Sequence, residues 1–204
     1  TKEEINKVKQ FAEEIKYKHP HFKDRRNTNI RSLNKVKEDV ILGKLAEVAV
    51  YKYLKSIYGD LVSEVDFNLY APGVADDYDI KVGNKTISIK ASKPNSSVLM
   101  IEKEKFEFDN NKKIKKVENK IPPDYFTFVR IELSGQIYAE IVGGLSLQEF
   151  ESKMRFMPRG MVMNRTNAYD YLVIGKELKE LRVQDKGSPL LADNYGVHAS
   201  QLSL

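Results

Sequence analysis

Three polar residues lie close together in the sequence and are of types that can do chemistry. Asp79 comes just before the pair Gly83-Asn84, and Ser88 and Lys90 come just after it. A carboxylate, a hydroxyl and an ammonium that meet on one surface can hold a metal ion or handle a proton. Whether they meet depends on the element that carries them.

A β-hairpin is predicted for this segment. Gly83-Asn84 suits the positive φ angles of a two-residue turn, and strand-forming residues flank it on both sides. If Val82 faces Lys85, counting outward sets Asp79 opposite Ser88 and Asp77 opposite Lys90, with Lys90 diagonally beside Asp79. The other face is apolar and collects Tyr78, Ile80, Val82, Ile87 and Ile89. An ordinary amphipathic hairpin would expose the charged face to water, so this geometry alone leaves both interpretations open.

Glu47 is the fourth candidate residue. It falls inside the apolar run LAEVAV of a segment with helical periodicity, on a face predicted to pack against a sheet. A carboxylate buried there is costly unless a cation, a metal ion or a hydrogen-bonded partner compensates it. Glu47 is therefore expected either to help a metal site or to form a salt bridge with a lysine.

The order of these features resembles the PD-(D/E)xK nuclease superfamily. The resemblance rests on Glu47 in the helical segment GKLAE, on Asp79 at the start of a strand, and on Ser88-Ile89-Lys90 after the turn, within residues 35–93. Tyr78 stands where the motif name has proline. Ser88 stands where the family usually has an acidic residue, and a hydroxyl cannot supply the charge that helps to hold a divalent cation.

The resemblance implies a fold, a cofactor and a set of roles. The expected fold is α/β (α+β), with a central mixed β-sheet and a catalytic hairpin flanked by helices, as in restriction endonucleases. Asp79 and the carbonyl of Ile89 would bind Mg²⁺, or Mn²⁺ as a substitute, and Glu47 would bind the same ion through water or bind a second ion. Lys90 would position or help deprotonate the attacking water, and Ser88 would hydrogen-bond a metal-bound water.

The expected activity is cleavage of double-stranded DNA to 5′-phosphate and 3′-hydroxyl ends. A small enzyme of this kind looks like a type II restriction endonuclease, which would act as a homodimer. A structure-specific repair, recombination or phage nuclease, such as a Holliday junction resolvase, is the alternative within the class. Two further alternatives are a DNA-binding subunit with a weakened site and a basic protein whose hairpin matches by chance.

Basic and amide side chains outside the hairpin are candidates for DNA contact. A net charge of +5 suits a polyanionic partner, because lysine and arginine gain by releasing counterions from phosphates. Amide and guanidinium groups can also hydrogen-bond base edges. The candidates are Arg25, Arg26, Arg31, Lys93, Arg159, Asn164, Arg165 and Asn167.

Composition excludes several classes of protein. The chain has no cysteine, so it has neither a disulfide nor a thiol nucleophile, and an intracellular, cytoplasmic setting is expected. No apolar run approaches the roughly 20 residues that span a bilayer, and the first residues do not have the pattern of a signal peptide. A soluble protein without a membrane partner is expected.

The expected organisation is one nuclease domain over residues 1–204. An N-terminal helix and basic loop (1–33) precede a long helix at 34–58 that ends at Gly59, and a tail (183–204) wraps the domain or is partly mobile. Strands are predicted at 64–69, 98–102, 125–133, 137–142 and 169–174, and short helices at 146–153 and 176–181. Residues 107–120, rich in lysine, are predicted to form a surface loop or helix connector.

Overall fold

The computed structural model describes residues 1–18, 32–70, 78–117, 121–164 and 186–203. The chain forms two compact units: residues 1–94 with 123–142, and residues 95–122 with 143–204. The predicted strand at 169–174 and helix at 176–181 lie outside the described residues, as does part of the predicted tail.

Two helices begin the first unit, and a hydroxyl side chain caps the N-terminus of each. In α1 (Lys2–Lys18), the Thr1 hydroxyl accepts a hydrogen bond from the Glu4 amide at 3.3 Å. In α2 (Leu33–Tyr58), the Ser32 hydroxyl accepts one from the Lys35 amide at 3.2 Å. The helix ends at Gly59, whose φ of 56° favours glycine, and a 3-10 turn (Gly59–Leu61) follows.

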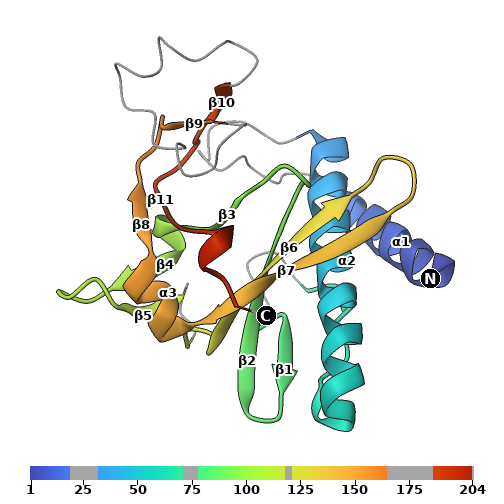
Figure 1. Cartoon of the computed structure of the whole chain (residues 1–204). Coiled ribbons are helices and arrows are strands. Elements are labelled where there is room, and N and C mark those ends of the chain that lie inside the picture. Colours follow the sequence, from blue (N-terminus) through green and yellow to red (C-terminus); the bar gives the residue numbers. More distant parts are fainter. Residues whose placement is uncertain (19–31, 71–77, 118–120, 165–185, 204) are drawn as a thin grey trace. The chain divides into compact units, whose positions relative to one another are not determined.

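A mixed four-stranded sheet completes this unit. Its strands are β1 (Ile80–Val82), β2 (Lys85–Ser92), β6 (Tyr125–Glu132) and β7 (Tyr138–Ser146), in the order β1-β2-β6-β7. Strands β1 and β2 are antiparallel, whereas β2 and β6 are parallel. The mixed α/β prediction is therefore confirmed at this coarse level. Figure 1 shows α2 lying along the β1–β2 hairpin, with α1 against α2.

The core of the first unit lies between α2 and one face of the sheet. Apolar residues at helical spacing on α2 meet residues that alternate on the strands, which is how an amphipathic helix and a half-buried sheet bury their apolar faces together. The buried members are Val8, Leu42, Leu45, Ala46, Val50, Val62, Ile80, Ile87, Ile89, Val129 and Ile131.

The strand predicted at 64–69 is wrong. Only the chain just before it pairs with β1, through a bridge between Val62 and Val82 and a 2.8 Å hydrogen bond from the Ser63 amide to the Lys81 carbonyl. The Asp66 carboxylate then accepts a hydrogen bond from the Asn68 amide at 2.7 Å. A backbone amide that donates to a nearby side chain is not available to a neighbouring strand, and residues 64–69 do not extend the ladder.

The second unit contains a three-stranded antiparallel sheet in the order β3-β11-β8. These strands are β3 (Val98–Glu102), β11 (Asn194–His198) and β8 (Arg155–Met157). The central strand comes from the predicted tail, so those residues form part of a sheet and do not wrap a finished domain. Gly196 permits this packing, because a Cβ there would lie 2.5 Å from the Met157 sulfur and 2.8 Å from Val98 Cγ1.

The lysine-rich segment also differs from its prediction. It forms a hairpin of β4 (Phe106–Phe108) and β5 (Ile114–Val117) that follows a 3-10 turn (Lys103–Lys105), because Phe106 and Ile114 are buried and anchor it. The helix predicted at 146–153 is confirmed as α3 (Leu147–Lys153), with Ser146 and Glu149 forming a capping box. The remaining elements are β9 (Val162–Asn164), β10 (Lys186–Pro189) and a 3-10 turn (Ala199–Gln201).

None of the helices in the described ranges has the length and apolar character needed to cross a membrane.

Candidate functional site

The β1–β2 hairpin has the predicted register from Ile80 to Ile87, but the ladder ends before the predicted Asp79–Ser88 pair, and Asp77 lies outside the described residues. Val82 pairs with Lys85, Lys81 with Thr86 and Ile80 with Ile87, around a turn in which Gly83 has a φ of 58°. The apolar face is confirmed, since Ile80, Ile87 and Ile89 are buried in the core against α2. Tyr78 differs from its prediction: it is absent from that core, and its ring lies 5.9 Å from the Lys81 ammonium.

Asp79 ends the pairing of the two strands. It lies one residue before β1, and its amide still donates to the Ile87 carbonyl at 3.2 Å. Its carboxylate then takes the place of a backbone acceptor, because Oδ2 accepts a hydrogen bond from the Ile89 amide at 2.5 Å. The Asp79 side chain is therefore fixed against the peptide of the residue that precedes Lys90.

The carbonyl of Ile89 lies on the same edge of β2 as this contact. In an extended strand, the N–H and C=O of one residue point to the same side. Since the Ile89 amide points at Asp79 Oδ2, its carbonyl also points to the Asp79 side. A carboxylate and a peptide carbonyl, both hard oxygen donors, thus share one edge of the hairpin.

Ser88 and Lys90 lie on the opposite face of β2 from Ile87 and Ile89, and this face is half-buried. In the parallel ladder with β6, Ser88 pairs with Phe126 and Lys90 with Phe128, and both phenyl rings are fully buried. A hydroxyl and an ammonium therefore sit beside apolar rings and not on an open polar surface. Low-dielectric surroundings strengthen the interactions of an ammonium with any negative group that approaches it.

Glu47 is buried on α2, with 9% of its surface exposed, and it has a partner. The Lys44 ammonium lies 2.6 Å from Glu47 Oε2, and each side chain keeps only 12% of its surface exposed. The same ammonium lies 5.4 Å from the Phe11 ring and 5.8 Å from the Phe67 ring. The salt bridge that the sequence left open as an alternative is present, so burial of Glu47 does not by itself require a metal ion.

Asp124 is a positioning residue that the sequence analysis missed. Its carboxylate accepts hydrogen bonds from the Lys85 ammonium at 2.8 Å and from the Thr86 amide at 2.9 Å, and the Thr86 hydroxyl accepts one from the Asp124 amide at 3.1 Å. The Lys85 ammonium and the Thr86 amide hold the pKa of the Asp124 carboxyl below its usual range. These bonds tie the start of β6 to the hairpin turn across a sequence separation that no local pattern signals.

The oxygen donors of the hairpin suit a hard cation. Magnesium typically takes one or two carboxylates and completes its shell with water and substrate phosphate, so Asp79 and the Ile89 carbonyl fit as protein donors. Among the described residues, no group of three or more acidic, histidine or cysteine side chains is placed to hold a metal. Ser88 is a hydroxyl residue at a position where an acidic residue would add a further negative ligand for the ion. Two nearby aspartates, Asp76 and Asp77, lie outside the described residues.

Of the candidate DNA contacts, the structure describes Lys93 in the first unit and Arg159 and Asn164 in the second. Lys93 forms an ion pair of 2.7 Å with Glu38, and Lys93 lowers the pKa of that carboxyl. Arg159 is exposed, and its amide donates to the Asp193 carboxylate at 2.8 Å. Asn164 ends β9. The other candidates lie outside the described residues, and these are Arg25, Arg26, Arg31, Arg165 and Asn167.

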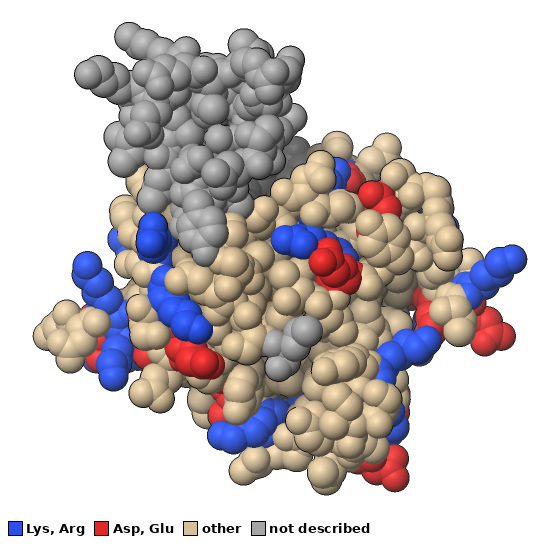
Figure 2. Space-filling model, viewed as in Figure 1, with Lys and Arg blue, Asp and Glu red and all other residues tan. Residues whose placement is uncertain are grey.

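The charges on the described surface are mixed. On the face shown in Figure 2, lysine and arginine side chains are scattered, and several have an acidic side chain beside them.

Comparison with known proteins gives no relative. No family model, no curated protein and no solved structure matches the chain.

Proposed function

We propose that the chain is a Mg²⁺-dependent endonuclease that hydrolyses DNA phosphodiester bonds at the β1–β2 hairpin. The observation that carries this proposal is the contact of the Asp79 carboxylate with the Ile89 amide, 2.5 Å long. It brings a carboxylate and the Ile89 carbonyl to one edge of β2, next to Lys90. Asp79 and that carbonyl would hold the ion, which supplies Lewis acidity toward the scissile phosphate when bound.

The protein's own groups have separable roles in this proposal. Lys90 orients the attacking water and offsets negative charge that develops on the phosphate, from a half-buried position beside Phe128. Ser88 hydrogen-bonds water on the same face. Water adds to phosphorus, the bond from phosphorus to the 3′ oxygen breaks, and that oxygen leaves with a proton, which gives 5′-phosphate and 3′-hydroxyl ends.

Glu47 has a supporting role in the proposal. Its carboxylate is already paired with the Lys44 ammonium, so in this proposal Glu47 supports the site from α2 and is not the main ligand. Variants of the Lys44–Glu47 pair can separate a catalytic role of this carboxylate from a role in folding alone.

The test is cleavage of a supercoiled plasmid with Mg²⁺. Asp79→Asn and Lys90→Ala should each lower the cleavage rate at least about 100-fold while the circular dichroism spectrum and thermal midpoint stay close to wild type. Matched controls are Asp60→Asn, a fully exposed aspartate, and Lys81→Ala, a lysine elsewhere on the same hairpin; both should cut normally. Normal cleavage by either site variant would overturn the assignment.

The products separate the two kinds of nuclease. Discrete fragments from a long DNA would support a site-specific type II enzyme that acts as a homodimer. Cleavage restricted to junctions, flaps or other DNA with unpaired nucleotides would support the structure-specific alternative.

A further inference from the structure

A row of aromatic rings in the second unit ends at the surface. The Phe108 ring lies 4.8 Å from the Tyr195 ring, and Tyr195 lies 5.6 Å from Phe156. Tyr195 is buried, whereas Phe156 on the edge strand β8 keeps 46% of its surface exposed. The buried Tyr195 ring packs against Phe156, which presents apolar surface to solvent.

A cationic side chain lies beside this exposed ring. The Lys103 ammonium lies 5.2 Å from the centroid of the Phe156 ring, and the Lys103 amide donates to the Asp193 carbonyl at 2.9 Å. Arg155, directly before Phe156 on β8, is also exposed, but its side chain belongs to the opposite face of the strand. A ring with an ammonium beside it offers stacking and charge neutralisation together.

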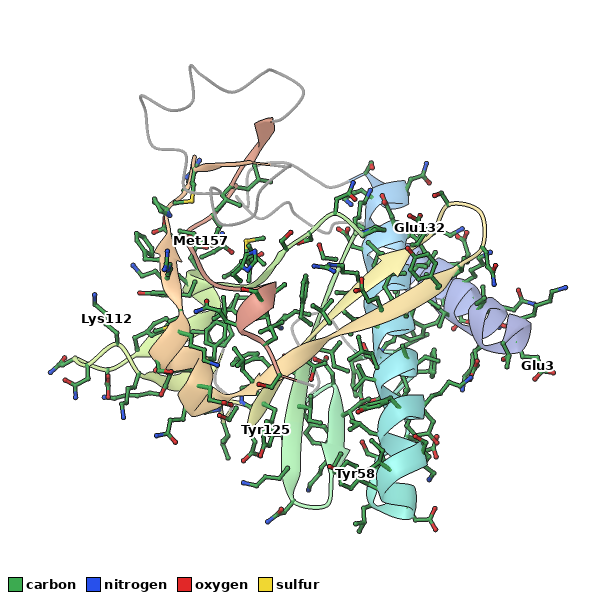
Figure 3. All side chains as sticks on the ribbon, viewed as in Figure 1. Glu3, Tyr58, Lys112, Tyr125, Glu132 and Met157 are labelled. Atoms are coloured by element: carbon green, nitrogen blue, oxygen red, sulfur yellow. The ribbon has the colours of Figure 1, made fainter. Side chains whose placement is uncertain are left out.

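The hairpin that follows Lys103 carries more positive charge. Residues 103–116 contain six lysines against three acidic residues. Lys112, Lys113 and Lys115 are exposed, and within the described chain none of them forms an ion pair. Figure 3 shows Lys112 at the outer end of this hairpin.

Hydrogen bonds to two carboxylates fix the backbone of this hairpin. At its tip the Asp109 carboxylate accepts hydrogen bonds from the amides of Asn111 and Lys113, both at 2.8 Å. Just after the tip, where β5 begins, the Ile114 amide donates to the Glu151 carboxylate of α3 at 2.7 Å. A fixed backbone loses little conformational freedom when its side chains bind a ligand.

We propose that Phe156, Lys103 and the lysines of the β4–β5 hairpin form a binding surface for a DNA strand with unpaired nucleotides. Phe156 would stack on a base, and the lysines would neutralise phosphates. Bases within a duplex are stacked on one another, so only unpaired bases offer a free face to the ring. The proposal rests on the proposed function for the choice of DNA as the polymer, and it favours the structure-specific class of nuclease.

The chain offers a direct reporter, because it has no tryptophan. Phe156→Trp places a single indole at the proposed stacking position. With EDTA present to block cleavage, titration with a 20-nucleotide oligo(dT) should quench its emission in a saturable way, and the same midpoint should appear in the anisotropy of a labelled oligonucleotide. A blunt duplex of equal length should bind several-fold more weakly and quench little.

Two variants test the parts of the surface. Phe156→Ala should weaken oligo(dT) binding at least about fivefold, the lower bound for losing one stacked base, whereas Tyr58→Ala, an equally exposed aromatic on α2, should not. Lys112→Gln with Lys113→Gln should reduce the slope of log affinity against log salt by about 1.4, and Lys2→Gln with Lys9→Gln on α1 should leave it unchanged.

Failure of this proposal is distinguishable from failure of the proposed function. Asp79→Asn should bind oligo(dT) as wild type does, since binding needs no metal. If wild type binds as described but cuts no DNA, the nuclease proposal fails and the binding surface stands. Three results would overturn the proposed binding surface. They are binding of oligo(dT) without a change in the emission of the introduced indole, equal binding of the duplex, and no binding of oligo(dT).

Discussion

The buried pair of Lys44 and Glu47 gives the sharpest prediction, because it separates folding from catalysis. Each side chain is 12% exposed and the charged atoms are 2.6 Å apart. Removing one partner of a buried pair typically costs about 3–5 kcal/mol, since the remaining charge stays in an apolar setting. We expect about 3 kcal/mol for Lys44→Met, at the lower end because both groups retain some contact with water.

Replacing both partners should cost much less. In the variant with Lys44→Met and Glu47→Leu, apolar side chains of similar size fill the space beside Phe11 and Phe67, and no charge is left behind. The double variant should lie within about 1 kcal/mol of wild type, so the coupling between the two positions should be at least about 2 kcal/mol.

Urea unfolding followed by circular dichroism measures these differences. With a slope of about 2 kcal/mol per molar urea, Lys44→Met should move the midpoint down by about 1.5 M, and the double variant should restore most of it. A loss below about 1 kcal/mol for Lys44→Met, or a double variant no more stable than either single one, would refute this account of the pair.

Cleavage by the double variant then decides the role of Glu47. Because this variant is expected to be stable, a plasmid assay with Mg²⁺ reports catalysis alone. Full activity would make Glu47 a folding residue, and loss of activity with retained stability would place its carboxylate in the reaction.

Other predictions concern single positions. Ser88→Asp should lower the thermal midpoint in EDTA, because the new carboxylate repels the Asp79 carboxylate. Added Mg²⁺ should stabilise this variant more than wild type, and half-maximal cleavage should need less Mg²⁺. An unchanged response to Mg²⁺ would argue against a metal ion at this edge of the hairpin. Asp124→Asn should cost about 1 kcal/mol at pH 7, where the carboxylate is charged and bonded to Lys85. Because the pKa of the Asp124 carboxyl is lowered in the folded protein, wild type loses the stability given by this carboxylate as the pH falls through that pKa. The free energies of unfolding of wild type and Asp124→Asn should therefore converge in acid. Curves of stability against pH that stay parallel would contradict this role of Asp124. Gly196→Ala should cost about 1–3 kcal/mol by overpacking against Met157, measured by urea unfolding, and a neutral result would show that the sheet relaxes freely.

Several local elements of this chain could be predicted from the sequence, although the β4–β5 hairpin was not. Capping residues set the starts of α1 and α3, the periodicity of apolar residues set the buried face of α2, and Gly83-Asn84 fixed the register of the β1–β2 hairpin. These features depend on residues a few positions apart, which is why a pattern in the sequence can report them.

Contacts between distant segments were decided only by the tertiary structure. The last segment became the centre of a sheet because Gly196 lets Met157 and Val98 meet over it.

The candidate site shows the same division. The sequence by itself determined that Ser88 and Lys90 share a face of β2 and that Asp79 lies at the end of the hairpin, because alternation along a strand is fixed by backbone geometry. Only the folded chain decided that Asp79 binds the Ile89 amide, that Asp124 clamps the turn, and that Lys44 neutralises Glu47. Each of these depends on where a side chain finds a partner in space, and the free energy of such a contact is set by burial and distance that no spacing in the sequence records.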